Sequence, residues 1–154
     1  MWGDPPYLGK MQIFPMKLED LPQVAKLAGQ LGYPTTLDDV RSRFEAMVRD
    51  PEMALFVARD ERNHVLGWTH VRLEPKSLLH GVCVEVAALV VDENYRGQGV
   101  GQKLLREGEA WARHRGFREI RLRSNVKRQD AARFYLREGY EISKQSNVFA
   151  KNLG

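Results

Sequence analysis

Three glycines within five positions could bring a ligand close to the backbone. Gly97, Gly99 and Gly101 follow Arg96, between an apolar run and a stretch with helical periodicity. The first N–H groups of a helix lack intrahelical acceptors and carry the positive end of the helix dipole, so a glycine-rich entry suits an anion such as a phosphate. A tight strand-to-helix connection without a ligand would use the same glycines, and the spacing alone leaves both interpretations open.

Two familiar phosphate-binding patterns are excluded at this stretch. The P-loop pattern G-x-x-x-x-G-K-[ST] is absent. A dinucleotide fingerprint G-x-G-x-x-G that began at Gly97 would need glycine at position 102, where the chain has Gln102. Any anion held here is therefore bound by a different kind of loop.

Glu85 is the second residue that could do chemistry. It is the only ionisable carboxylate within the apolar run "VCVEVAALVV" (82–91). A buried carboxylate must be protonated, paired, or in contact with a water-filled cleft. Burial would raise its pKa towards neutrality, which suits a general base. The alternative is a water-facing Glu on one side of an amphipathic strand.

The histidines show no metal-binding pattern. His64, His70, His80 and His114 include no His-x-x-x-His pair and no adjacent acidic cluster, so no metal is expected. His70 and His80 lie on and just after an expected strand. They are candidates for lining a substrate pocket, with ordinary surface placement as the alternative.

The elements that would position these residues follow from hydrophobic periodicity. Strands are expected at 11–16, 53–59, 65–73, 82–92 and 118–124, with further strands at 139–143 and 146–151. Helices are expected after a capping Asp20, after Thr36, and at 99–115 and 127–137. The crossover through 99–115 should set strand 118–124 parallel to strand 82–92.

Length and composition favour a single domain over residues 11–154. Residues 1–10 are expected to be a loose arm or a cloning remnant and do not resemble a signal peptide. One cysteine, Cys83, favours a reducing cytoplasm. No apolar run reaches the roughly 18 residues that span a bilayer, so no membrane partner is expected.

Charge is unevenly distributed along the chain. Residues 96–137 carry a net charge of +8 and the remainder −4. A basic half suggests an anionic partner, either a polyanionic cofactor or nucleic acid, although solvated arginine faces would give the same count.

Two separate motifs resemble the GNAT superfamily of acyl-CoA-dependent N-acetyltransferases. In "VVDENYRGQGVG" (90–101), Arg96, Gly99 and Gly101 meet the family pattern [Arg/Gln]-x-x-Gly-x-[Gly/Ala], and "AARFYLREGY" (131–140) is similar to its later signature. The resemblance covers roughly residues 11–151. It implies an α/β fold of the α+β type, with a central mixed sheet of six to seven strands and about four flanking helices. More weakly, "SNVKRQDAARFYLREGYE" (124–141) looks like aminoalkylphosphonate acetyltransferases.

The resemblance implies acetyl-CoA as cosubstrate and assigns residues to hold it. The diphosphate would lie against Arg96 and the amides of Gly97, Gln98, Gly99, Val100, Gly101 and Gln102. The pantetheine arm would bond to the backbone of a strand splayed from its parallel neighbour, at Leu89, Val90 and Val91. Many members carry Asn where this chain has Arg128, so Asn125 or Arg128 would serve instead.

The resemblance also implies catalytic roles. Glu85 lies 11 residues before Arg96, where several members place a catalytic Glu, and would be the general base, acting through a water molecule. Tyr135 occupies the position that protonates the departing thiolate; the alternative is an aromatic packed beside Phe134. Cys83 shares a strand face with Glu85. An acetyl-cysteine route is conceivable there, yet a lone strand cysteine is usually a small buried hydrophobe.

The expected function is direct acetyl transfer to a primary amine of a small molecule or peptide. Tyr33, His70 and His80 are candidate acceptor contacts, and acidic Asp38, Asp39 and Glu74 could attract a cationic amine. Family members are often dimers, so a homodimer is one expectation. The alternatives are an acetyl-CoA-binding regulator without catalysis, and a nucleic-acid-binding module. The latter is disfavoured because the basic strand 118–124 alternates with aliphatic rather than aromatic residues.

Overall fold

The computed structural model describes residues 9–154, which form two compact units. The first ends at Arg123 and the second comprises Ser124–Gly154; each is described separately. Most of the expected N-terminal arm, residues 1–8, lies outside the described residues.

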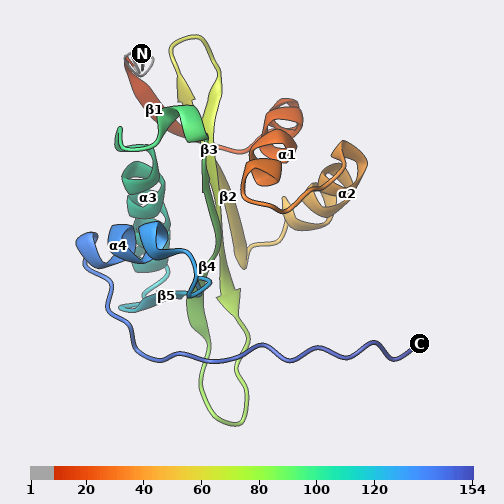
Figure 1. The fold of residues 1–154 in the computed structure, drawn as a ribbon, viewed down its shortest axis with the longest axis vertical. Helices are drawn as coiled ribbons and strands as arrows, with labels where there is room; N and C mark the ends of the chain where they lie inside the picture. The colour runs from red at the N-terminus through yellow and green to blue at the C-terminus, as the bar shows by residue number, and fades with distance from the viewer. Residues whose placement is uncertain (1–8) are drawn as a thin grey trace. The chain divides into compact units, whose positions relative to one another are not determined.

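The first unit is built on a five-stranded mixed sheet in the order β1-β2-β3-β4-β5 (Figure 1). Neighbours from β1 to β4 are antiparallel, whereas β4 and β5 are parallel, with Val84 opposite Ile120. This confirms the parallel pairing expected from the crossover. The strands are β1 (Met11–Pro15), β2 (Met53–Asp60), β3 (Val65–Glu74), β4 (Cys83–Val91) and β5 (Ile120–Leu122).

Helices cover both faces of this sheet (Figure 1). One face packs against α1 (Leu21–Gln30) and α2 (Leu37–Met47), which bury Leu21, Val24, Leu27 and Phe44 against strand residues such as Val57 and Val90. The other face packs against α3 (Val100–His114) through Val100, Leu104 and Ala112. Two short 3-10 helices precede α1 and α3, at Leu18–Asp20 (η1) and Glu93–Tyr95 (η2).

The polar residues that precede α1 and α2 form different hydrogen bonds. The second helix begins after Thr36, as expected, and Thr36 caps it, because its Oγ1 accepts a hydrogen bond from the N–H of Asp39 at 3.1 Å. Asp20 occupies the capping position of α1 but its side chain makes no cap bond there. The carboxylate instead forms a buried two-point ion pair with Arg59 of β2, at 3.0 and 2.5 Å. The prediction that the Asp20 side chain caps α1 is therefore wrong, because a buried guanidinium is a stronger partner for its carboxylate than a helix N–H.

The second unit contains α4 (Gln129–Arg137), as the periodicity predicts. The strands expected at 139–143 and 146–151 are wrong: residues 141–154 have no regular secondary structure, and the sheet has five strands rather than six to seven. A strand pattern is local, but a strand forms only where a neighbour accepts its hydrogen bonds. Val148 and Phe149 accordingly stay 93% and 90% exposed.

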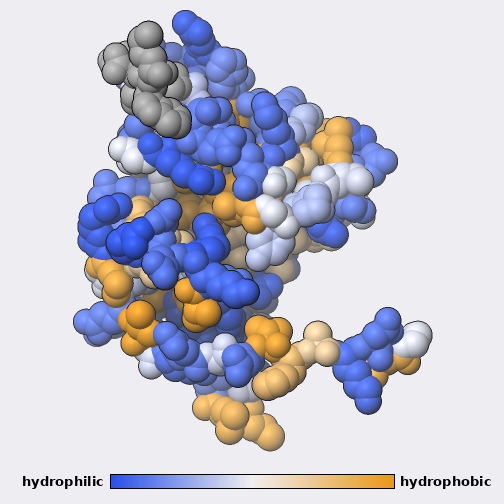
Figure 2. Space-filling model, in the orientation of Figure 1, coloured by the Kyte–Doolittle hydropathy of each residue, from blue (hydrophilic) through white to orange (hydrophobic). Residues whose placement is uncertain are grey.

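Apolar side chains also reach the surface in the first unit. Figure 2 shows an orange patch at the bottom of the view, over the loop between β3 and β4, where Leu78 and Leu79 are almost fully exposed. These side chains contribute nothing to the core. Among residues 9–154, no helix combines the length and apolar character that crossing a bilayer requires.

Close packing at Gly67 fixes where the entry of α3 lies on the sheet. A Cβ at Gly67 would come within 2.7 Å of the Val90 carbonyl oxygen and 3.0 Å of Leu104. The Gly67→Ala variant should therefore lose about 1–3 kcal/mol of unfolding free energy through overpacking. Denaturant unfolding of the purified variant measures this loss.

The matched control is Gly29→Ala in α1, where an added Cβ meets nothing within 4 Å. This change should be neutral or stabilise by up to about 1 kcal/mol, because Ala is the better helix former. Equal stability of the two variants would contradict the close approach at Gly67.

Candidate active site

A bulge in β4 decides which way Glu85 points. His70 of β3 lies opposite Ala88 and Val71 lies opposite Val86, so Ala87 is an extra residue without a partner. The carbonyl of Ala88 beside the bulge accepts a hydrogen bond from the buried Thr69 hydroxyl at 2.8 Å. The extra residue places Glu85 on the face that α1 and α2 cover, together with Val90.

Glu85 is only 5% exposed and is surrounded by arginines. Its carboxylate pairs with Arg72 of β3 at 3.4 Å and with Arg123, just beyond β5. Arg123 also contacts Glu74 at 3.3 Å, and Arg121 pairs with the same Glu74. We call these five residues the arginine–glutamate cluster. Of the states that the sequence leaves open for a buried Glu85, the structure shows the paired one.

The cluster perturbs its titratable members. The hydrogen bond from Arg121, aided by Arg123 and the neighbouring Glu85, lowers the pKa of Glu74 to about 2. The same carboxylates raise the pKa of both Arg121 and Arg123. Burial raises the pKa of the Cys83 thiol, which lies 3.7 Å from Glu74. A thiol held protonated is a poor nucleophile, so these surroundings do not favour the acetyl-cysteine route.

His70 lies on the same face of β3 as Arg72. Burial, followed by the nearby Arg72 charge, lowers the pKa of His70 to about 4, so the ring is neutral near pH 7. Within the described chain, the buried His70 Nε2 and Trp68 Nε1 have no hydrogen-bond partner. Trp68 otherwise packs against the core beneath α1. The two ring nitrogens are polar atoms that a bound molecule or water could satisfy.

The glycine loop after β4 is shaped by backbone conformation rather than by crowding. Gly97 and Gly99 have φ of 76° and 86°, and a Cβ at either would meet nothing within 4 Å. Gly99 is the N-cap of α3, so the N-cap residue itself has no side chain to bond the first turn of this helix. In residues 9–154, the buried Gln98 Nε2 also lacks a partner. The loop therefore leaves open space at the N-terminus of a 15-residue helix.

One edge of β4 is unpaired where it approaches this loop. The parallel ladder with β5 ends at Val86 opposite Leu122, whereas Leu89, Val90 and Val91 pair with β3 alone. Within the first unit, no described strand occupies the other edge of these three residues. Their outward backbone groups are available to a ligand, as the resemblance implies.

Three of the predicted site residues belong to the second unit. The Tyr135 ring contacts Phe134 and Tyr140, with centroid distances of 5.2 and 6.0 Å. Burial raises the pKa of the Tyr135 phenol, opposed by the Arg128 charge. Asn125 uses its Oδ1 to accept the Lys127 N–H at 2.9 Å, and Arg128 is the exposed N-cap of α4. Tyr135 is therefore both a packed aromatic and a phenol that stays protonated.

The remaining acceptor candidates are scattered. Tyr33, 70% exposed, lies between α1 and α2, and His80 is exposed in the β3–β4 loop. Among the contacts described for the first unit, none joins either residue to Glu85. Asp38 and Asp39 are exposed in the first turn of α2. Glu74 was expected to attract a cationic amine, but its carboxylate is already paired with Arg121 and Arg123.

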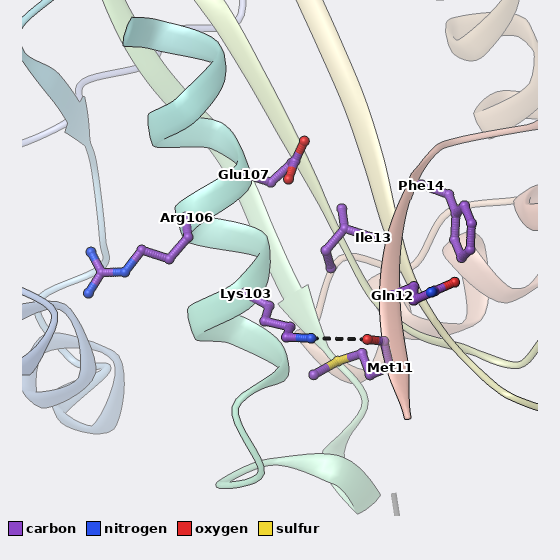
Figure 3. Close-up of a pocket in the computed structure, with 7 residues that line it drawn as sticks. All are labelled: Met11, Gln12, Ile13, Phe14, Lys103, Arg106 and Glu107. Carbon is purple, nitrogen blue, oxygen red and sulfur yellow. Dashed lines mark hydrogen bonds between the residues drawn. The ribbon is translucent and has the colours of Figure 1, made fainter. Parts of the chain in front are cut away.

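A hollow of about 600 Å³ lies elsewhere, between β1 and α3 (Figure 3). Its lining includes Ile13, Arg106 and Glu107, and Lys103 donates a hydrogen bond to the Met11 carbonyl at 3.0 Å across it. None of the predicted catalytic residues lines this hollow, so its size does not mark the chemistry. Over the described residues, no group of three His, Cys, Asp or Glu side chains is arranged to hold a metal.

Sequence reasoning missed the partners of Glu85. The alternation in "REIRLRS" (118–124) shows that one face of the strand is basic, but not what it faces. The expected parallel pairing contained part of the missing signal, because its register sets Arg121 opposite Glu85 and so brings Arg123, on the same strand face, within reach of that carboxylate. Arg72 could have been found only by also locating the bulge at Ala87.

Comparison with known proteins identifies relatives of the chain. The model of the acetyltransferase (GNAT) family matches residues 18–140. An aminoalkylphosphonate N-acetyltransferase from Salmonella typhimurium is 49% identical over 59 residues, which are 38% of this chain and 38% of that protein. The matched part thus spans well under half of that curated relative.

Solved structures share the fold over nearly the whole chain. A transcriptional regulator from Bacillus halodurans C-125 superimposes with a TM-score of 0.79 and 25% identity, covering 92% of this chain and all of that one. An aminoglycoside acetyltransferase, AAC(6')-Iy, in complex with a CoA bisubstrate analogue superimposes with a TM-score of 0.82 and 18% identity, covering 94% and 99%.

The buried imidazole of His70 should make stability depend on pH. Because its pKa is about 4 in the folded state against 6.5 for an ordinary histidine, the unfolded chain binds the extra proton between these values. The contribution of His70 is fully present above about pH 6.5 and is lost as the pH falls towards 4. Urea unfolding across this range should show a weaker pH dependence for His70→Gln than for the unchanged protein.

The control is His114→Gln at the exposed end of α3, which removes an imidazole outside the core. This variant should keep the pH dependence of the unchanged protein. A His70→Gln variant that also kept it would contradict the assignment.

Proposed function

Because the chain belongs to the acetyltransferase (GNAT) family, whose model matches residues 18–140, we propose that it transfers an acetyl group from acetyl-CoA to a primary amine. One arrangement carries the proposal. The strand that holds the buried Glu85 continues, along an unpaired edge, into an open glycine loop at the start of α3. A proton acceptor and an anion-binding helix end are thus linked by a few residues of one strand.

The residues present fit acetyl-CoA as cosubstrate. The free helix end, the glycine φ values and the unpartnered Gln98 amide suit a diphosphate at residues 97–102. The outer edge of Leu89, Val90 and Val91 suits the amides of a pantetheine arm. When bound, acetyl-CoA supplies the activated acyl group. The AAC(6')-Iy complex with a CoA analogue, which shares the fold, supports this assignment.

The residues of the chain would then manage the protons. An amine near pKa 10 is protonated at neutral pH, so Glu85, directly or through water, takes one proton before the nitrogen can attack the thioester carbonyl. The C–N bond forms as the C–S bond breaks, and Tyr135 gives its proton to the departing thiolate. The second nitrogen proton restores the phenol. The products are an amide, free CoA and one proton released to water.

We propose a small-molecule amine as acceptor. The names of two relatives support this class, one an aminoalkylphosphonate acetyltransferase and the other an aminoglycoside acetyltransferase. For Asn125 and Arg128 we propose a role beside the cofactor, with Arg128 the better candidate because its guanidinium can make a charge-assisted hydrogen bond to a phosphate.

A nucleic-acid-binding role receives less support. Several arginines of the basic segment 96–137 are paired with carboxylates, among them Arg121 and Arg123 with the cluster glutamates and Arg133 with Asp130. These pairs neutralise part of the positive charge of the segment within the protein. An acetyl-CoA-binding regulator without catalysis is the outcome to expect if CoA binds and no amine is acetylated.

The catalytic assignment is tested by thiol release from acetyl-CoA with a panel of small amines. Glu85→Gln and Tyr135→Phe should each lower kcat by about 100-fold or more, because each removes one proton-transfer group. Acetyl-CoA affinity, measured by calorimetry, should change little in both. Unchanged turnover in both variants would refute the two roles.

The cofactor loop is tested by a pair of substitutions at Gly99 that differ only in charge. Asp and Asn are similar in size, and both tolerate positive φ better than most residues. Asp can also cap α3 and should not lower Tm below that of the Asn variant. Gly99→Asp should nevertheless bind acetyl-CoA about 10-fold more weakly than Gly99→Asn, because its carboxylate repels the diphosphate. Equal affinities would show that the diphosphate lies elsewhere.

A further inference from the structure

We infer that the acceptor amine carries an anionic group, and that Arg72 and Arg123 exchange their pairing with Glu85 for pairing with that group. This inference rests on the proposed function and extends it to the acceptor. The anion is a phosphonate, a phosphate or a carboxylate, joined to the amine by a short alkyl chain. Its binding releases the Glu85 carboxylate at the moment when the ammonium arrives.

The charges of the cluster do not balance. The arginine–glutamate cluster contains three guanidinium groups and two carboxylates, which leaves one positive charge unmatched. Nearby His70 adds no charge, because its lowered pKa keeps it neutral near pH 7. An acceptor with an ammonium and an anion complements the cluster, since the anion meets the surplus guanidinium charge while the ammonium meets Glu85.

The ion pairs of the cluster differ in geometry from a fixed structural pair. Arg59 holds Asp20 through both Nε and Nη2, with both side chains buried, as expected of a fixed structural pair. Arg72 instead reaches Glu85 through Nη2 alone at 3.4 Å, and within the described chain its buried Nε has no acceptor. Arg123 divides its two Nη atoms between Glu85 and Glu74. Neither Arg72 nor Arg123 makes the two-point ion pair that would fix it to Glu85.

The guanidinium groups of the cluster are more accessible to solvent than the carboxylate of Glu85. The side chains of Arg123 and Arg72 are 61% and 39% exposed, whereas that of Glu85 is 7% exposed. A solute therefore meets the guanidinium groups before it meets the carboxylate. An anion that draws these groups outward opens the way to Glu85.

The exchange also removes a difficulty in the chemistry. The lone pairs of Glu85 that face Arg72 and Arg123 are occupied by these ion pairs and are not free to hydrogen-bond an incoming ammonium. An amine without an anionic group leaves Arg72 and Arg123 paired with Glu85. An anionic amine moves them to its own oxygens, so the proton acceptor becomes available only with the matching acceptor bound.

The test compares 2-aminoethylphosphonate and β-alanine with ethanolamine, a short amine without an anionic group. For the unchanged protein, kcat/KM should be at least about 10-fold higher for an anionic amine, since a hydrogen-bonded ion pair contributes about that factor. The two anionic probes distinguish a phosphonate from a carboxylate preference. Thiol release that is equally fast with ethanolamine would overturn the inference while leaving the proposed function intact.

The roles of the two arginines are tested by Arg72→Gln and Arg123→Gln. In each variant, kcat/KM for an anionic amine divided by kcat/KM for ethanolamine should be close to one. The control is Arg113→Gln on α3, whose guanidinium is 72% exposed and 3.9 Å from Glu109; it should keep the ratio. Arg123→Lys, which retains the charge, should give an intermediate ratio. A preference that survives in both glutamine variants would overturn the assignment of these arginines.

A binding measurement decides the inference without turnover. Calorimetry with methylphosphonate, in the presence of saturating CoA to occupy the cofactor loop, should detect binding to the unchanged protein and a loss of binding in Arg123→Gln. No binding to the unchanged protein would overturn the anion site. If no amine released thiol yet methylphosphonate bound in an Arg123-dependent way, the proposed catalysis would fail and the anion site would stand.

Discussion

The burial of one carboxylate governs the arrangement of β3, β4 and β5. Removing Glu85 from water costs several kcal/mol unless cations meet it. β3 supplies Arg72, and β5 ends where Arg123 can reach the same group. The short β5 is therefore more than a marginal edge strand: its position carries the counter-charge for Glu85 as well as a ladder of hydrogen bonds.

β4 serves two purposes along its length. Up to Val86 it is paired on both sides, and this rigid part holds Glu85. Beyond the bulge only β3 pairs with it, which leaves one row of backbone groups unused before the glycine loop. Gly67 lets α3 approach the sheet closely, so the helix end lies directly after this row. A fixed charge and an open edge thus follow one another within nine residues.

Much of the fold was predictable because its signals are local. Periodicity located the helices and five strands, and the start of the second helix after Thr36 was among these predictions. The use of Asp20 was not predictable, because its partner Arg59 is 39 residues away. At the candidate site, the glycine loop and the unusual position of Glu85 could be read from the sequence. The arginines around Glu85 could not, since register and bulge decide which side chains face one another.

The extra residue in β4 has a consequence for how the chain can vary. Without Ala87, the strand preceding it would turn over by one residue. Val84 and Val86 would then face the side of α1 and α2, and Glu85 would enter the apolar layer beneath α3, beside Val71 and Ala112. No guanidinium of the cluster lies on that side. A single-residue deletion at this exposed alanine would thus be more damaging than most substitutions in the core, because it would exchange the polar and apolar surfaces of half a strand.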